Sequence, residues 1–354
     1  YRINYVRLPT DANQQRELIV RRLAAEDDTV DLVGMDVIWT AEFAEAGWIL
    51  PWEGERREAA EEGRLEGPLA TVTYEGEVWA APFTSNTQLL WYRRDRVDDP
   101  PEDFTWDEMI DDAVQQGRDI EVQGRQYEGL TVWVNALIES AGGQIVNDEG
   151  DVVVDDTART AAEIIRKLAR SPAAPPGLAT NAEDDARLGF ESGRSNYQLN
   201  YTFIYPSAAE VGEDFQANIG WARYPRSVPG EPSRPPLGGI NIGVGAYSEK
   251  PDLAFDAAEC LTSEANQLIA AEKGGLAPSS AAVYDEPALR EAFPFADLLR
   301  ESIEAGGPRP VTPAYADISL AIQKTYHPPD DVDPATVVQE LTDRIDRAVE
   351  GGIF

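Results

Sequence analysis

The sequence predicts an α/β protein of two domains, on the basis of its length and its pattern of apolar residues. The chain has 354 residues, which is more than one hydrophobic core usually supports. Short apolar runs alternate with segments of helical periodicity, a pattern typical of βαβ units and of a parallel sheet. No apolar run approaches the roughly 20 residues that cross a bilayer. We therefore expect a soluble α/β chain divided into two domains.

The first strand and helix are predicted at the start of the chain. Arg2–Leu8 has the composition of a strand, and an export signal would lie upstream of it. Thr10 or Asp11 can cap the helix that follows. The residues of this helix that we expect to face inward are Leu18, Ile19 and Leu23.

The segment 31–47 combines a strand, an acid and a helix. Its apolar run is too short for a helix and suits a strand covered on both faces. Thr40 is a candidate N-cap of the following helix, and Gly47 is a candidate C-terminal stop. Ligands of α/β sheets lie beyond strand ends, so we interpret Asp36 as a hydrogen-bond acceptor and Trp39 as an apolar platform beside it. The alternative, that Asp36 only caps the helix and Trp39 belongs to the core, stays open.

Two asparagines further along the chain occupy positions that call for an explanation. After a predicted hairpin at 74–79, Asn86 lies where the chain enters an apolar strand, and Asn135 lies among apolar neighbours on a predicted amphipathic helix at 129–143. A buried amide is either paired within the core or directed into a cleft. Between them, Thr105 with a glutamate three residues later forms a capping box, which is a structural signal only.

The second half of the chain contains further candidate contacts. The predicted strand 198–205 ends in aromatic residues, which either stack on the C–H faces of a sugar or form a packed cluster. The glycine-rich strand 238–245 lets the backbone approach another group closely. A long helix is predicted at 253–271. Arg309 lies in a proline-flanked loop, which suits a directed hydrogen-bond donor.

The charge balance excludes some partners. The chain carries 64 acidic and 30 basic residues, which gives a net charge of −34. Phosphate contacts need clustered Lys and Arg, so we exclude nucleic acid and expect no polyanionic ligand. The acids are scattered through helices and loops, so we interpret them as a solvated surface whose self-repulsion indicates adaptation to salt or to another special growth condition.

One cysteine and one histidine limit the chemistry of the chain. Cys260 is interpreted as a buried free thiol, and it excludes an internal disulfide and a cysteine-based metal cluster. Every Ser-His-Asp or Cys-His arrangement would have to use His327, which precedes two prolines in a predicted loop. The acids of 147–151 resemble a calcium loop, but their register is wrong. We predict no metal, no cofactor and no catalysis.

A series of motifs runs along the chain in a recognisable order. They are 29–33 with Asp36, 46–51, 90–95, 140–143, 190–194 and Gly238-Gly239. In this order they resemble the extracellular solute-binding proteins, family 1, of carbohydrate ABC importers, over essentially the whole chain. Within that family, 36–48, 86–92 and 309–315 are most similar to the trehalose-binding lipoproteins of actinobacterial trehalose-recycling importers.

The resemblance implies a two-lobed fold of the periplasmic-binding-protein type II, with a cleft between the lobes and a hinge of about three chain crossings. The crossings are expected near 84–88, 221–225 and 278–283. The implied N-terminal lobe is 1–86 and 224–280, and the implied C-terminal lobe is 87–223 and 281–354. The family pattern has a further strand and helix before the first strand predicted here, and one of its aromatic segments corresponds to 201–203.

The resemblance also implies a function and a site. The chain would capture a disaccharide, trehalose first, as a monomer outside the cytoplasmic membrane, anchored by a lipid, and deliver it to an ABC permease. The alternatives are a maltose-like α-glucoside or oligosaccharide, a polyamine, or a glycoside hydrolase that uses the carboxylates of Asp36 and Glu42. The implied sugar contacts are Asp36, Asn86, Asn135, Tyr201, Phe203, Gly239, Ile240 and Arg309, with Trp39 and Glu42 as further candidates.

Overall fold

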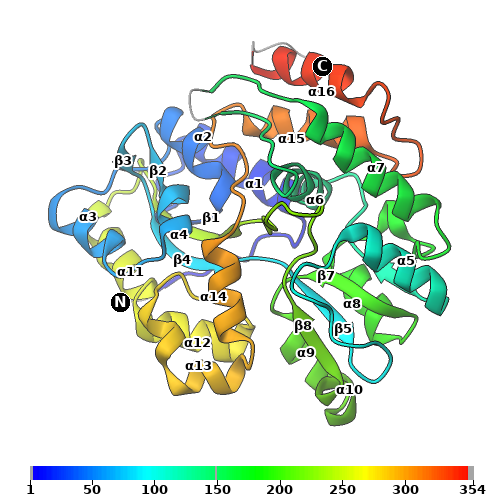
Figure 1. The fold of residues 1–354 in the computed structure, drawn as a ribbon. Helices are drawn as coiled ribbons and strands as arrows, with labels where there is room; N and C mark the ends of the chain where they lie inside the picture. Colours follow the sequence, from blue (N-terminus) through cyan, green and yellow to red (C-terminus); the bar gives the residue numbers. More distant parts are fainter. Residues whose placement is uncertain (1–2, 148–149, 350–354) are drawn as a thin grey trace.

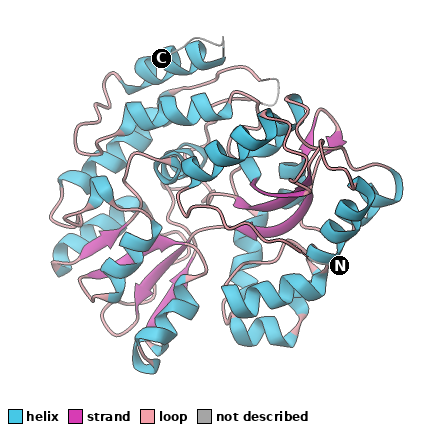
Figure 2. Ribbon diagram, turned by 180° about the vertical axis from the view of Figure 1, so that it is seen from behind, coloured by secondary structure: helices cyan, strands magenta, loops and turns pink. Residues whose placement is uncertain are grey.

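Two separate β-sheets form the centres of two lobes in the computed structural model, which describes residues 3–147 and 150–349 (Figure 1 and Figure 2). The first sheet has the strand order β1-β9-β4, the second has the order β6-β7-β5-β8, and β2 and β3 form a separate hairpin. The strands are β1 (Leu32–Asp36), β2 (Thr73–Tyr74), β3 (Glu77–Val78), β4 (Ala81–Asn86), β5 (Leu89–Arg93), β6 (Asp119–Glu121), β7 (Ser195–Asn200), β8 (Ile219–Ala222) and β9 (Gly238–Val244).

Helices surround both sheets. The longer helices are α1 (Ala12–Ala24), α3 (Gly54–Glu61), α5 (Trp106–Gln116), α6 (Glu128–Glu139), α7 (Asp156–Arg170), α8 (Glu183–Glu191), α9 (Ile204–Val211), α11 (Pro251–Leu261), α12 (Glu264–Gly274), α14 (Ala296–Glu304), α15 (Tyr315–Tyr326) and α16 (Val337–Val349). The shorter ones are η1 (Val37–Trp39), α2 (Thr40–Glu45), α4 (Glu66–Val72), η2 (Leu178–Thr180), α10 (Glu213–Ala217), η3 (Ala282–Asp285) and α13 (Pro287–Ala292). In Figure 1, α2, α3 and α4 lie on the side of the first sheet, and α5 and α8 lie on the side of the second.

The first sheet is not the parallel sheet that the sequence predicts. β9 pairs antiparallel with β1 along one edge and antiparallel with β4 along the other. This strand comes from a much later part of the chain and separates two strands that run in the same direction. Among the described strands, only β6 and β7 pair in parallel. Local alternation of strands and helices cannot reveal a strand inserted from so far along the chain.

The strand predicted at 2–8 is wrong in its described part. Residues 3–8 form no strand, and no described strand pairs with them. Tyr5 is 81% exposed. A strand needs a neighbour to hydrogen-bond its backbone, so apolar composition alone does not make one here.

The helix predicted next is present as α1. The Asp11 carboxylate caps it by accepting a hydrogen bond from the Gln14 backbone N–H at 3.1 Å. Ile19 and Leu23 are buried as expected, whereas Leu18 is 38% exposed. The inward face of α1 is therefore narrower than the sequence predicts.

The segment 31–47 folds as strand, turn and helix, as predicted, but with a different cap, and the strand is not covered on both faces, because Gly34 is exposed between buried Val33 and Met35. β1 ends at Asp36, whose carboxylate caps the 3₁₀ turn η1 by accepting from the Ile38 backbone N–H at 3.4 Å. Thr40 is the first residue of α2 and not its N-cap. Gly47 follows the helix with a φ of +66°, the conformation expected of a glycine stop.

The predicted elements near the two aromatic candidates and Asn135 are shifted. The strand predicted at 198–205 ends at Asn200, so Tyr201 and Phe203 lie in the turn that leads into α9. The capping box at Thr105 is present and starts α5. The helix that carries Asn135 is buried on all sides over most of its length, and is therefore a core helix.

The long helix predicted at 253–271 is two helices. α11 ends before Thr262, and α12 begins after Ser263, whose extended backbone starts the new helix. Cys260, near the end of α11, is exposed and not buried as predicted. The two helices pack on different clusters: Phe255 and Ala258 of α11 lie in the core around the first sheet, and Ala271 of α12 lies in a cluster that also contains Trp91 of β5.

Each lobe has its own core, and a third cluster joins them. Phe43 and Trp52 belong to the core of the first lobe, and α6, α7, α15 and α16 bury their apolar faces in the core of the second. In the joining cluster, Phe295 packs edge-on against Trp91, with the ring centroids 5.1 Å apart. The lobes therefore share apolar packing at one side of their junction.

The chain passes between the sheets at two connections that can be located directly. One is 87–88, between β4 and β5, and the other is 223–237, between β8 and β9. The crossings predicted near 84–88 and 221–225 fall at these connections. Further on, α13 and α14 contact α12 and α4, while Phe295 packs on the second sheet. The lobe boundary predicted at 280 stays a prediction.

Candidate ligand-binding site

Three charged residues from distant parts of the chain meet where the two lobes face each other. Asp36 ends β1, Glu128 begins α6, and Arg309 lies in the loop 305–314 between α14 and α15. Arg309 Nη1 donates to Glu128 Oε1 at 2.6 Å, and Arg309 Nη2 donates to Asp36 Oδ1 at 3.1 Å. One guanidinium thus bridges an acid of each lobe, a geometry that the planar fork of arginine makes possible.

Glu128 is the most enclosed member of this trio. It also accepts hydrogen bonds from the hydroxyl groups of Tyr315 and Ser319, the second at 2.7 Å. Burial raises the pKa of Glu128 above its ordinary value, and the neighbouring Arg309 opposes that shift. For Arg309 itself, burial would lower the pKa, but Asp36 and the other nearby acidic groups raise it well above the ordinary value. The guanidinium is therefore charged.

Asp36 caps a turn, as one interpretation of the sequence expects, and it also accepts a hydrogen bond from Arg309, whereas its contact with a ligand stays a prediction. The Asp36 side chain is 24% exposed. Trp39 is 2% exposed and stacks on Phe43 with ring centroids 5.9 Å apart. Its place in the structure is thus the core of the first lobe, although a ligand contact at Trp39 stays a prediction.

Strand β9 brings the predicted backbone contacts next to this trio. Ile240 lies opposite Asp36, and Asn86 lies opposite Gly238 in the strand pairing. A Cβ added to Gly238 would lie 3.7 Å from Arg309 Nη2. Gly239 has a φ of +140°, and a Cβ there would lie 2.1 Å from the Thr84 carbonyl oxygen. Only glycine fits at that position.

Three buried polar atoms around the trio have no hydrogen-bond partner among the described residues. They are Asn86 Oδ1, Asn135 Oδ1 and Arg309 Nε. Asn135 is joined to the arginine loop, because its Nδ2 donates to the Pro308 carbonyl at 3.4 Å. Buried polar atoms are almost always paired. Two acceptors and one donor at or next to the trio are thus unpaired, and contact of these three residues with a ligand stays a prediction.

The remaining predicted contacts have different surroundings. Burial raises the pKa of Tyr201, and Arg309 opposes that shift. Phe203 packs on the cluster that joins the lobes, and its Cα is 3.1 Å from a Cβ added to Gly275. Glu42 Oε2 accepts from Arg16 Nε at 2.8 Å within the first lobe. Roles for Phe203 and Glu42 in the site stay predictions.

Sequence reasoning missed Glu128, Tyr315 and Ser319. The signal for Glu128 was present, because a lone acid heads a helix whose following residues, 129–138, are almost all apolar. A carboxylate at the edge of such a helix needs a partner. Its partners come from a segment more than a hundred residues later, so the sequence alone could not name them.

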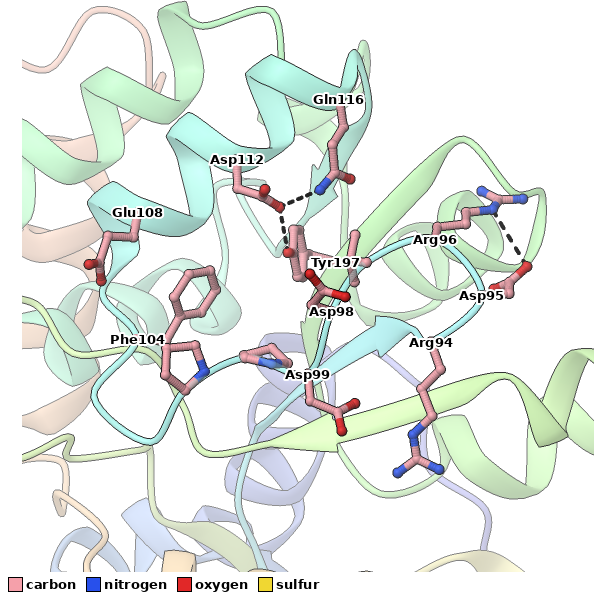
Figure 3. Close-up of a pocket in the computed structure, with 13 residues that line it drawn as sticks. Arg94, Asp95, Arg96, Asp98, Asp99, Phe104, Glu108, Asp112, Gln116 and Tyr197 are labelled. Atoms are coloured by element: carbon pink, nitrogen blue, oxygen red, sulfur yellow. Dashed lines mark hydrogen bonds and ion pairs between the residues drawn. The ribbon is translucent and has the colours of Figure 1, made fainter.

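A separate surface cavity lies in the second lobe, between the chain after β5 and helix α5 (Figure 3). Its lining includes none of the predicted contacts. Asp112 points toward two of its neighbours, and its Oδ2 accepts from Tyr197 Oη at 2.6 Å and from Gln116 Nε2 at 2.6 Å. At least one of the acids in this cavity is thus paired within the lobe.

Among the described residues, no group of three or more His, Cys, Asp or Glu could hold a metal ion. The predicted resemblance to a calcium loop includes residues 148–149, which lie outside the described part of the chain. Over the same part, none of the helices has the length and apolar character needed to span a bilayer.

Comparison with known proteins places the chain in a family. The family model described as "Bacterial extracellular solute-binding protein" matches residues 1–268. A probable ABC transporter-binding protein of Deinococcus radiodurans is 26% identical over 330 residues, which cover 88% of this chain and 76% of the relative. The chain therefore belongs to the bacterial extracellular solute-binding proteins.

Solved structures agree with this assignment. Maltose-bound MalE3 of T. maritima has a TM-score of 0.84 and 27% identity, covering 98% of this chain and 90% of that one. The GacH receptor of Streptomyces glaucescens, solved unliganded and with acarbose, has a TM-score of 0.85 and 21% identity, covering 99% and 91%. These likenesses confirm the predicted two-lobed α/β fold.

Proposed function

We propose that this solute-binding protein captures a disaccharide, trehalose first, between its two lobes and delivers it to the permease of an ABC importer. The observation that carries the proposal is the set of unpaired polar atoms at Asn86, Asn135 and Arg309 beside the bridge to Asp36. These residues come from both lobes and from the loop between α14 and α15. A ligand held there would touch both lobes at once.

The chemistry of these groups suits a neutral, hydroxyl-rich ligand. A sugar hydroxyl both donates and accepts, so it can pair with an amide oxygen and with a guanidinium N–H. Asp36 accepts from hydroxyl groups, and the backbone around Gly239 allows close approach. Tyr201 and Phe203 would cover the apolar C–H faces of the sugar rings.

The relatives support this ligand class without fixing the sugar. The solved relatives carry maltose in one case and acarbose in another, and the curated relative is described as an ABC transporter-binding protein. Our preference for trehalose rests on the similarity of 36–48, 86–92 and 309–315 to trehalose-binding lipoproteins. A maltose-like α-glucoside is the second candidate.

Two other ligand or activity classes are weaker. A polyamine would meet the positive charge of Arg309, which is 6% exposed and fixed by two acids. A glycoside hydrolase would need two free carboxylates flanking the bond that is cleaved. Both carboxylate oxygens of Glu42 are instead paired with Arg16, so Asp36 has no second free carboxylate there to act with it.

Delivery follows from closure of the lobes on the ligand. The connections 87–88 and 223–237 can act as a hinge, since each passes between the sheets. Closure buries the sugar and creates one continuous surface from two lobes, which a membrane permease can recognise. In this proposal the protein works as a monomer outside the cytoplasmic membrane, held there by a lipid anchor.

Calorimetric titration with trehalose, maltose, glucose and spermidine tests the proposal. We expect heat with trehalose, and its loss in Asp36→Ala and Arg309→Ala. The matched control is Asp317→Ala, an exposed acid on α15, which should bind like the wild type. Binding of maltose alone would mean that the ligand is maltose-like and not trehalose, while the proposed site would stand. Binding of spermidine alone would refute the sugar proposal. Chromatography of the sugar after incubation would expose any turnover.

A further inference from the structure

We infer that Glu128 is a positioning residue for ligand capture: it fixes the guanidinium of Arg309 on the second lobe, so that the other N–H groups of that guanidinium face the first lobe and the ligand. This inference rests on the proposed function, because it assigns a role within the same site. It adds a residue that neither the sequence motifs nor the family resemblance identifies.

The two bonds of Arg309 differ in which parts of the molecule they join. Glu128 heads α6, and the loop with Arg309 leads into α15, which packs against α6 in the core of the second lobe. The bond to Glu128 therefore stays within one lobe. The bond to Asp36 crosses to the first lobe. When the lobes separate, the first bond is retained and the second is broken.

Glu128 is 7% exposed, and both of its carboxylate oxygens already accept hydrogen bonds from groups of the second lobe. Arg309 and Tyr315 donate to its Oε1, and Ser319 donates to its Oε2. Ser319 is itself held by Gln323 Nε2 at 3.0 Å. Because both carboxylate oxygens are occupied by groups of the second lobe, Glu128 acts on a ligand through Arg309 and not by direct contact.

The surroundings of Arg309 show what this arrangement keeps available. Its Nη1 is bound to Glu128, its Nη2 reaches Asp36, and its Nε has no partner among the described residues. In an open state without Glu128, the guanidinium would lack a counter-charge in its lobe and would turn toward water. With Glu128 in place, the fork stays preorganised, which lowers the ordering cost of binding.

The first test needs no sugar. Protein labelled with ¹⁵N-arginine is compared by NMR as wild type, Glu128→Gln and Glu121→Gln. Glu121 is the matched control, a buried acid of the same lobe that accepts from Ser195 and Asn181. We expect separate, slowly exchanging Nη signals of Arg309, assigned by their loss in Arg309→Lys. They should merge in Glu128→Gln and stay separate in Glu121→Gln. Unchanged signals in Glu128→Gln would overturn the inference.

The second test measures sugar affinity by calorimetry. Loss of the charged bond in Glu128→Gln should weaken binding about 10- to 100-fold, whereas Glu121→Gln should stay within about twofold. If Glu128 acts through Arg309, adding Glu128→Gln to Arg309→Lys should cost nothing further. The positioning role would be refuted if the double variant lost affinity by the product of the two single losses. Wild-type affinity in Glu128→Gln would also refute it.

The two tests separate the inference from the proposed function. If the wild type binds none of the sugars, the proposed function fails, and the Arg309 signals still decide whether Glu128 fixes the guanidinium. If Glu128→Gln does not fold, Glu128→Asp replaces it, because the shorter side chain keeps the charge but withdraws it from Arg309. Merged signals in Glu128→Asp would support the role, and separate ones would overturn it.

Discussion

Asp36 and Glu128 accept hydrogen bonds from the same arginine, yet they belong to different environments. Glu128 is 7% exposed and is enclosed by hydroxyl donors of the second lobe. The Asp36 side chain is 24% exposed, at the end of a strand of the first lobe. One partner of Arg309 is thus part of a core, and the other is partly accessible to solvent.

This difference matters because the energetics of ion pairs depend on burial. Removing one member of a buried pair leaves an uncompensated charge and costs much more than the pair contributes. Removing one member of an exposed pair usually costs little. Stability should therefore depend on the Glu128 side of Arg309, and binding should depend on both sides.

The largest effect is expected when the shared arginine is removed. Arg309→Ala leaves Glu128 buried without its counter-charge, so we expect the free energy of unfolding to fall by about 3–5 kcal/mol. Urea unfolding measures this change. The control is Arg300→Ala, which removes a half-exposed helix pair with Glu304 and should cost less than about 1 kcal/mol. An equal loss of unfolding free energy in Arg309→Ala and Arg300→Ala would contradict the idea that the buried ion pair matters more for stability than the exposed one.

Glu121 is a second buried acid of the same lobe, and its distance to the nearest guanidinium, that of Arg194, is 3.8 Å, compared with 2.6 Å between Glu128 and Arg309. Burial raises the pKa of Glu121 from 4.5 to about 7, although Ser195 and Arg194 oppose the shift. Between these two pH values the folded state binds the extra proton, so stability is lost as the pH rises. The full loss is about 3 kcal/mol.

Urea unfolding at pH 5 and pH 8 checks this prediction. Glu121→Gln should lose about 3 kcal/mol less than the wild type between these pH values. Glu304→Gln, which removes an exposed acid, should follow the wild-type profile. A profile of Glu121→Gln that matches the wild type would show that burial of Glu121 is offset by its neighbours.

The stability of the first lobe should depend on the close backbone contact between Gly239 of β9 and Thr84 of β4. Gly239→Ala would place a Cβ 2.1 Å from the Thr84 carbonyl oxygen at a φ of +140°, so we expect a loss of about 2 kcal/mol. The control is Gly34→Ala on β1, where the nearest atom would be 3.8 Å away. Thermal unfolding compares the two variants, and equal stability would mean that β9 can shift without cost.

These residues also show how far the sequence could be followed. Asp36 was predicted as a site residue from its strand end. Arg309 was predicted as a directed donor from its proline-flanked loop and as a sugar contact from the family resemblance, and the structure joins the two residues by a hydrogen bond. Both predictions used signals within a few residues. Glu128 was missed because its importance depends on Tyr315 and Ser319, which only the tertiary fold brings to it.

The same reason explains the errors in the fold. The strand at 32–36 was found from its local apolar run, but its neighbour in the sheet is β9. Pairing between such distant segments is decided by the packing of the whole lobe. The strand predicted at 2–8 was wrong in its described part for a related reason. Its composition suits a strand, but no described strand pairs with it.

The smallest change in stability is expected at Asp36, and it is the sharpest probe of the comparison. Asp36→Asn keeps a side chain that caps η1 as well as aspartate does, so the strand end should stay intact. The substitution removes a partly exposed charge from Arg309, and the free energy of unfolding should change by less than about 1 kcal/mol. Sugar affinity should nevertheless fall about tenfold, because the accessible acceptor has lost its charge. If stability instead fell as far as in Arg309→Ala, Asp36 would be a core partner of Arg309 like Glu128. Asp36 could then not replace its hydrogen bond from Arg309 by one from the sugar.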